Sequence, residues 1–195
     1  MKTAAFYDLE NMGLASKNGE FEKTFSALLK KIPGNELVGE IVIQKAYISK
    51  SHPSLQHIQT ALNKHNVELV AVEPVSNIGQ KKSNMVDFKM NVDVIATISP
   101  RRSIKTIAVA SGDKDFGFMC QQIKDMDRKL LIVSRFETTG DAMLKLCDDW
   151  VDTGDQPLTP KFIHKIIETR IRFNSAGLDF YDALRVSYPP WKMII

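Results

Sequence analysis

The sequence lacks the features that mark membrane or secreted proteins. Its 195 residues include no run of 18 apolar residues, so no membrane-spanning helix is expected. The opening MKTAAFYDLE reaches acidic residues at once, so no signal peptide is expected. The two cysteines, Cys120 and Cys147, lie in apolar stretches, which predicts reduced core thiols and a cytoplasmic protein.

The sequence also lacks a large excess of charge of either sign, with 26 basic and 23 acidic residues. The formal net charge of +3 neither establishes nor excludes a nucleic-acid partner. Local basic pairs could still form a patch that holds a nucleic-acid backbone, or they could be solvated surface charges: Lys30–Lys31, Lys81–Lys82 and Arg101–Arg102. Apolar residues at 44% and charged residues at 25% are typical of a globular protein, and the length fits one α/β domain with a small appendage.

Short apolar segments alternate with amphipathic ones along most of the chain. The pattern predicts strands at 3–7, 41–48, 67–72, 104–110, 130–134 and 150–151. It predicts helices at 21–32, 55–62, 85–98, 116–126 and 142–147. Strands that alternate with helices favour a three-layer α/β/α fold with a mostly parallel central sheet.

A domain boundary is expected near the end of the chain. The stretch DTGDQPLTP, at 152–160, separates a domain at 1–153 from a short helical C-terminal extension at 154–195. The extension is too short to form its own core, so it either packs on the main domain or begins a further module.

Aspartates follow two of the predicted strands. Asp8 ends the first strand, and Asp113 and Asp115 follow the fourth in the segment SGDKDF. The carboxyl ends of parallel strands face one crevice, so these acids can meet. Asp87 and Asp93 lie on the helix before the fourth strand, and their separation is about 1.7 helical turns. They therefore point about 120° apart, and we do not expect both to contact one ion.

Carboxylates gathered in this way favour a metal site. Like charges repel and raise one another's pKa, and a divalent cation would neutralise them. Oxygen ligands without nearby cysteine or histidine favour Mg²⁺ or Mn²⁺ over Zn²⁺. Such a cluster is typical of sites where one or two ions activate a water against a phosphodiester.

Each acid also has a structural explanation. Asp113 can cap a helix that carries Asp115 in its first turn. Asp8 can form an Asx-turn with Asn11.

The two helix acids have structural explanations as well. Asp87 can be an exposed acid of a first helical turn. Asp93 sits among apolar residues, where an unpaired carboxylate is costly, and Lys89 four residues earlier is a candidate partner.

Three segments together resemble a known family. They are FYDLEN (6–11), KKSNMVDFKMNVDVIATI (81–98) and VASGDKDFGFMCQQIKDMDRKLLIVS (109–134). The sequence resembles the NYN domains of the LabA-like (DUF88) group, within the PIN-like nuclease superfamily. The resemblance runs from Thr3 to Asp152, and it implies a parallel sheet, an acidic site for Mg²⁺ or Mn²⁺, and ribonuclease activity.

Matched position by position, the resemblance implies roles for individual residues. The catalytic acids would be Asp8, Asp87, Asp93, Asp113 and Asp115. Of these, Asp8, Asp93, Asp113 and Asp115 would hold the metal, with Asp87 behind them or as an alternative ligand. Asn11 and Ser111 would orient a water or a phosphate oxygen of the substrate. Lys81 and Lys82, with Arg101 and Arg102, are candidates from their charge to hold the backbone of a single strand.

The match has two departures from the family pattern. Leu9 and Glu10 follow Asp8, where many members have a glycine at the second position of the motif, and these two residues would narrow the groove or add charge. The lysine that normally precedes the helix aspartate is displaced, because Lys82 lies five residues before Asp87.

The leading hypothesis is a metal-dependent ribonuclease that acts on single-stranded RNA, with no membrane partner and with a homodimer as an option. A second hypothesis is a non-catalytic module that binds RNA or protein and retains the metal site. A third, a haloacid dehalogenase-type phosphohydrolase, requires a second aspartate where the chain has Glu10. Tyr7 and Phe116 flank the acids and could stack on bases, although such residues more often belong to the core.

Overall fold

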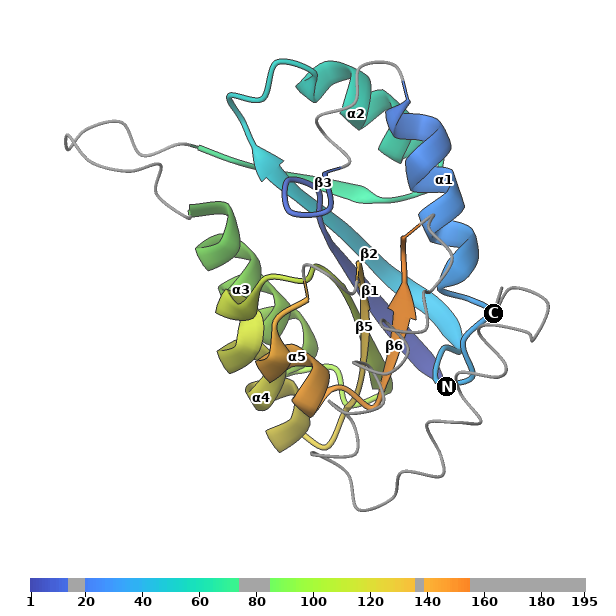
Figure 1. Cartoon of the computed structure of the whole chain (residues 1–195), viewed down its shortest axis with the longest axis vertical. Coiled ribbons are helices and arrows are strands. Elements are labelled where there is room, and N and C mark those ends of the chain that lie inside the picture. The colour runs from blue at the N-terminus through green and yellow to red at the C-terminus, as the bar shows by residue number, and fades with distance from the viewer. Residues whose placement is uncertain (14–19, 74–84, 136–138, 155–195) are drawn as a thin grey trace, which may run out of the picture.

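The structure is a computed structural model, and it describes residues 1–13, 20–73, 85–135 and 139–154 (Figure 1). Lys81 and Lys82 lie outside the described residues, as does the predicted extension beyond Gly154.

The sheet contains six parallel strands in the order β3-β2-β1-β4-β5-β6. The strands are β1 (Lys2–Asp8), β2 (Glu40–Ser49), β3 (Glu68–Val72), β4 (Ile104–Ala110), β5 (Lys129–Ser134) and β6 (Asp149–Asp152). The helices are α1 (Phe21–Lys31), α2 (Leu55–Asn63), α3 (Met85–Ile98), α4 (Gly117–Asp125) and α5 (Asp141–Leu146), with a short 3₁₀ turn, η1 (Lys114–Phe116), before α4. The predicted α/β fold with a parallel sheet is confirmed.

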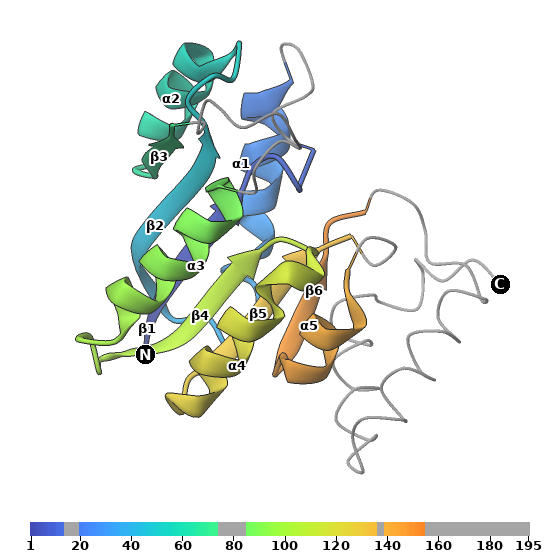
Figure 2. The same cartoon turned by 90° about the vertical axis from the view of Figure 1, so that its left-hand side faces the viewer.

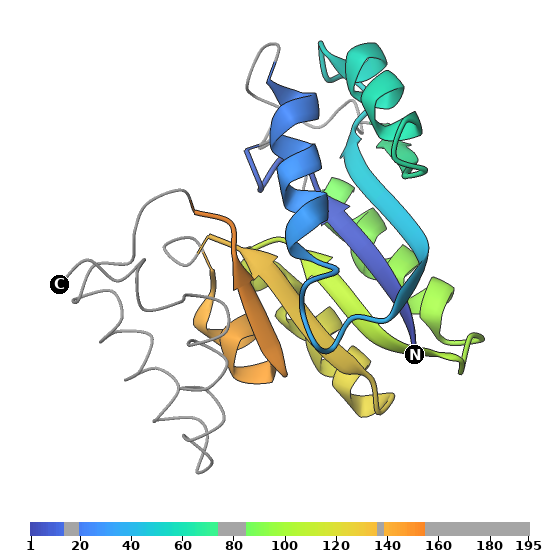
Figure 3. The same cartoon turned by 90° about the vertical axis from the view of Figure 1, so that its right-hand side faces the viewer.

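Two hydrophobic cores cover the two faces of the sheet. Helices α3, α4 and α5 lie on one face and α1 and α2 on the other, as the turned views show (Figures 2 and 3). The central strands β1 and β4 are buried along almost their whole length. This explains their continuous apolar sequences, because a parallel strand covered on both faces cannot alternate with polar residues.

The cores also contain both cysteines. Cys120 and Cys147 are buried free thiols, so the predicted core role is confirmed. Burial raises the pKa of the Cys120 thiol to about 12, which keeps it protonated. None of the helices in the described ranges has the length and apolar character needed to cross a bilayer.

The order of the strands reverses direction between β1 and β4. The chain builds β1, β2 and β3 toward one edge, then returns to place β4 on the other side of β1. Tyr7 near the end of β1 is level with Ala110 at the end of β4. The segments that follow these two strands therefore begin side by side, at the position where α/β proteins commonly bind ligands.

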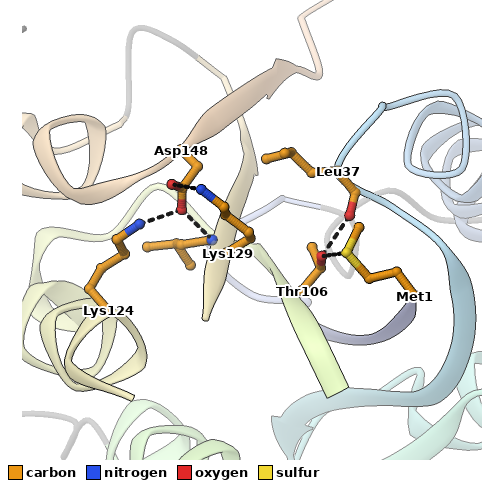
Figure 4. Close-up of polar contacts among 7 residues, drawn as sticks. Met1, Leu37, Thr106, Lys124, Lys129 and Asp148 are labelled. Atoms are coloured by element: carbon orange, nitrogen blue, oxygen red, sulfur yellow. Dashed lines mark hydrogen bonds and ion pairs between the residues drawn. The ribbon is translucent and has the colours of Figure 1, made fainter. Parts of the chain in front are cut away.

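Polar contacts elsewhere fix the sheet to its surroundings (Figure 4). The Asp148 carboxylate accepts hydrogen bonds from Lys124 Nζ at 2.5 Å, from Lys129 Nζ at 3.2 Å and from the Leu130 amide at 2.8 Å. These bonds join α4 to the start of β5 and to the turn before β6. Asp148 therefore has a structural role, and it lies beside the start of β5, at the opposite end of the strands from Asp8.

Candidate functional site

Asp8 is the most deeply buried acid of the candidate site. Its side chain is on the face of the sheet covered by α3, and the residue is 1% exposed. One carboxylate oxygen accepts a hydrogen bond from the Asn11 amide at 3.1 Å, and the other accepts one from the Ser111 hydroxyl at 3.0 Å. Burial raises the pKa of Asp8 to about 7, against the opposing effect of these two bonds, and the negative charges of Asp87 and Glu10 add to the rise.

The loops after β1 and β4 are bonded directly to each other. The Asn11 side-chain oxygen accepts a hydrogen bond from the Gly112 amide at 3.2 Å. The Ser111 hydroxyl donates to Asp8 and accepts from the Asp113 amide at 3.2 Å. The Asn11 backbone bond to Asp8 is the local turn expected from the sequence. The side chains of Asn11 and Ser111 go further, because they join two segments about a hundred residues apart and fix the orientation of Asp8.

Asp113 and Asp115 lie at the start of η1. Asp113 caps this turn, because one of its carboxylate oxygens accepts a hydrogen bond from the Asp115 amide at 3.0 Å. The capping role considered from the sequence is therefore present. Asp113 is half-buried and Asp115 is exposed, so both carboxylates remain open to solvent at the end of β4.

Gly140 holds the loop after β4 in place. Its amide donates to the Gly112 carbonyl at 2.8 Å. A Cβ atom at this position would lie 2.7 Å from Lys114 Cβ and 3.0 Å from Lys114 Cα. Only glycine allows this close approach, so the segment before α5 supports the loop that carries Asp113.

The helix α3 brings Asp87 to the same group of acids. Burial, together with the negative charges of Asp113, Asp115 and Glu10, raises the pKa of Asp87 to about 6. Asp8 and Asp87 also interact electrostatically. Asp87 therefore lies within the electrostatic field of Asp8 on one side and of Asp113 and Asp115 on the other.

Asp93 has different neighbours. Its carboxylate accepts hydrogen bonds from the Tyr47 hydroxyl at 2.7 Å and from Lys45 Nζ at 3.0 Å, both on β2. Burial favours the neutral acid, but these bonds and the charges of Lys45 and Lys89 outweigh it, so the net effect lowers the pKa of Asp93. Lys89, the partner suggested by the sequence, contributes charge, while Lys45 and Tyr47 make the contacts.

Two residues of the site were underweighted by sequence reasoning. Glu10 adds a fifth negative charge, and its carboxylate accepts a hydrogen bond from the Ser49 amide at 2.9 Å, beside the end of β2. Lys45 interrupts the apolar strand IVIQKAYI, and a lysine at such a position is itself a sign of a buried partner. Leu9, by contrast, is buried in the core against α1 and does not narrow a groove.

Several residues considered for RNA contacts lie elsewhere. Tyr7 and Phe116 are fully buried core residues, and the Tyr7 hydroxyl donates to Gln44 at 2.8 Å, so neither ring is free to stack on a base. Arg101 and Arg102 are exposed, but they precede β4, whereas Asp113 follows it, so they lie at the opposite end of this strand. They are therefore surface charges away from the acids.

The acids are near one another without forming a closed cage. Within the described residues, no three acidic, histidine or cysteine side chains stand close enough to coordinate one ion together. In the same part of the chain no lysine or arginine forms an ion pair with Asp8, Asp87, Asp113 or Asp115. The charge of the group is thus left without a basic partner on the described elements.

Comparison with known proteins agrees with the geometry. A crystal structure of a protein of unknown function from Vibrio parahaemolyticus RIMD 2210633 is similar to this chain with a TM-score of 0.61 and 19% identity, over 79% of this chain and 93% of that one. At this identity the likeness shows the fold alone. No curated protein matches the sequence. The sequence matches the NYN domain family over residues 2–155, and NYN domains are generally nucleases that typically use divalent metals. The chain therefore belongs to the NYN domain family.

Proposed function

We propose that this protein is a metal-dependent ribonuclease that hydrolyses phosphodiester bonds of single-stranded RNA at the carboxyl ends of β1 and β4. The observation that carries the proposal is the group of acids without a basic partner among the described residues. Burial and mutual repulsion raise the pKa of Asp8 to about 7 and that of Asp87 to about 6. A protein that keeps such an unfavourable arrangement has a use for it, and pKa values of this kind cluster at functional sites.

The donor set fits Mg²⁺ or Mn²⁺. Carboxylate oxygens are the ligands these ions prefer, and Mg²⁺ usually keeps several waters and is held by only one or two carboxylates. An open group of acids is therefore compatible with such an ion. We assign Asp8, Asp87 and Asp113 as the acids around the ion, of which one or two would hold it directly while the others would bind its waters. A bound cation would supply a water of lowered pKa and would neutralise charge on the phosphate.

The assignment of Asp87 in place of Asp93 follows from their contacts. Asp93 is bonded to Lys45 and Tyr47, whereas Asp87 interacts with Asp8, Asp113 and Asp115. The ligand role that the family resemblance implies for Asp93 stays a prediction, as does that of Asp115.

The remaining residues act through the acids. Ser111 is buried, and its hydroxyl donates to Asp8 and accepts from the Asp113 amide. Its role is therefore to orient Asp8, and we do not assign it a contact with the phosphate. Asn11 fixes the distance between the two loops. Asp113 uses one oxygen to cap η1 and keeps the other for a ligand.

The alternative of a non-catalytic RNA-binding module has one observation in its favour. No three-residue metal group is formed among the described residues, so the site as it stands is not preassembled around an ion. The family match does not favour the phosphohydrolase alternative.

A cleavage assay separates these possibilities. Labelled single-stranded RNA and DNA are incubated with the full chain in Mn²⁺, Mg²⁺ or EDTA. Asp8→Asn and Asp113→Asn are compared with Asp125→Asn, a matched control at the far end of α4, whose carboxylate accepts hydrogen bonds from Gln121 and Gln122 of the same helix. We expect metal-dependent cutting of RNA by the parent and by the control, and its loss in the two site variants.

Two results would count against the proposal. Cutting that persists in EDTA would show that the reaction needs no metal. Cutting that survives Asp8→Asn and Asp113→Asn would show that these acids are not the catalytic site. RNA binding without cutting by the parent would favour the non-catalytic module.

A further inference from the structure

Two aromatic rings are exposed beside the acidic group and have no role in the core. Phe88 is 64% exposed and Phe118 is 78% exposed. Among the described residues, only three other large apolar side chains are exposed, Met1, Val42 and Val92. Burying one aromatic ring is worth a few kcal/mol, so exposing two near one place points to a use outside the fold.

Both rings are attached to the elements that carry the acids. Phe88 directly follows Asp87 in the first turn of α3, and Phe118 comes three residues after Asp115 at the start of α4. Helices α3 and α4 pack on the same face of the sheet and begin at the end where β1 and β4 finish (Figure 2). The two rings are therefore exposed on the first turns of two neighbouring helices, at the end of the sheet where the acids lie.

The chemistry beside the rings suits a nucleic-acid strand. Lys89 follows Phe88, and Lys114 lies between Asp113 and Asp115; both lysines are exposed. Single-stranded nucleic acids are bound by aromatic rings that stack on bases together with cations that contact the backbone. A protein surface that covered the patch would instead have to accommodate these lysines and the acids at its edge.

We propose that Phe88 and Phe118 are base-stacking residues that hold the nucleotides on either side of the phosphate at the acidic group and thereby select single-stranded RNA. The inference rests on the proposed function and adds to it the residues that would bind the bases of the RNA. A duplex keeps its bases stacked inside the helix, so it cannot offer them to the two rings. Selection for single strands thus follows from the positions of the rings.

The test measures binding, so that it does not depend on cleavage. A fluorescent RNA of about 12 nucleotides, within the usual site size, is titrated with the full chain in EDTA and low salt, and anisotropy is read. An abasic strand with the same number of phosphates serves as the charge-matched ligand.

The variants separate stacking from general apolar contact. Phe88→Ala, Phe118→Ala and the matched Phe88→Leu and Phe118→Leu should each weaken binding of the RNA about 5- to 100-fold, the range for one lost base–aromatic stack. Binding of the abasic strand should not change. Phe88→Trp and Phe118→Trp should keep parental affinity, and Val42→Ala, on β2, is the control for loss of an exposed apolar residue.

Several outcomes would overturn the inference. They are an equal loss on the abasic strand, no loss in the alanine variants, full affinity in the leucine variants, and no measurable binding of RNA by the parent. A change of sedimentation coefficient in Phe88→Ala or Phe118→Ala would show that the patch joins two copies of the chain. RNA binding that follows the predicted pattern, with no cleavage in the separate assay with Mn²⁺ or Mg²⁺, would refute the nuclease proposal and leave the stacking surface intact, so the two failures are distinguishable.

Discussion

At the scale of single residues, the raised pKa of Asp8 is the main electrostatic feature of the site. Its folded-state pKa of about 7 lies above the ordinary value of 3.8. The folded state therefore holds its proton over a pH range in which the unfolded chain has lost it. The contribution of Asp8 to the free energy of unfolding is most favourable at low pH and is lost as pH rises from about 4 to about 7.

This shift predicts that Asp8→Asn stabilises the protein without metal. The amide keeps an acceptor for the Asn11 amide and a donor for the Ser111 hydroxyl, and it removes the buried charge. At pH 8 in EDTA we expect the free energy of unfolding to rise by about 2–4 kcal/mol. Urea denaturation across pH checks the prediction, and the gain should vanish near pH 4. A variant less stable than the parent at pH 8 would contradict the account.

At the residue scale the sequence predicted that acids gather at the ends of β1 and β4, and it could not predict which of Asp87 and Asp93 joins them. The spacing of Asp87 and Asp93 required them to point in different directions. Which one faces Asp8 depends on the rotation of α3 about its axis, which is fixed by Met90, Val94 and the neighbouring core side chains. That packing is a tertiary property, so no local pattern reports it.

Among the elements, α3 depends on a single polar anchor to the sheet. Lys45 and Asp93 are 16% and 17% exposed, and their ion pair with the Tyr47 bond ties the middle of α3 to β2. Loss of one partner leaves the other half-buried without its counter-charge. We expect Asp93→Asn to cost about 1–3 kcal/mol, less than for a fully buried pair because water still reaches both groups.

A double variant tests whether the ion pair itself accounts for this loss of stability. The double variant Lys45→Met with Asp93→Leu should recover most of the lost stability in urea denaturation, because it removes both charges together. Unchanged stability in Asp93→Asn would show that the ion pair does not hold α3.

The close approach of Gly140 to Lys114 gives a second prediction for an element. Alanine fits the Gly140 backbone, whose φ is −66°, but its Cβ would displace the loop that carries Asp113. We expect Gly140→Ala to lower RNA cleavage at least about tenfold, since a misplacement of about 1 Å can cost more than that. Gly34→Ala is the matched control, because its Cβ would make only an ordinary contact of 3.7 Å with the Lys31 carbonyl. Equal activity in the two variants would contradict the role of Gly140.

For the whole molecule, most of the fold could be predicted from the sequence. Continuous apolar strands and amphipathic helices alternate, and that alternation admits few arrangements other than a parallel sheet covered on both faces. The sequence also predicted that Asp8 and Asp113 would meet at the ends of neighbouring strands. It could not predict the rings that remain exposed, because Phe88 and Phe116 both fall in apolar patterns and only the packed structure shows that one is buried and the other is not.

The central claim at this scale is that the acids at the ends of β1 and β4 form one site for a divalent cation. Calorimetric titration of Mn²⁺ into the full chain tests it most directly. Asp8→Asn, Asp87→Asn and Asp113→Asn should each weaken Mn²⁺ binding at least about tenfold, since even residues behind the ligands commonly cost that much. Asp93→Asn and the control Asp125→Asn should bind as the parent does. Equal Mn²⁺ affinity in all five variants, or a loss confined to Asp93→Asn, would contradict the site described here.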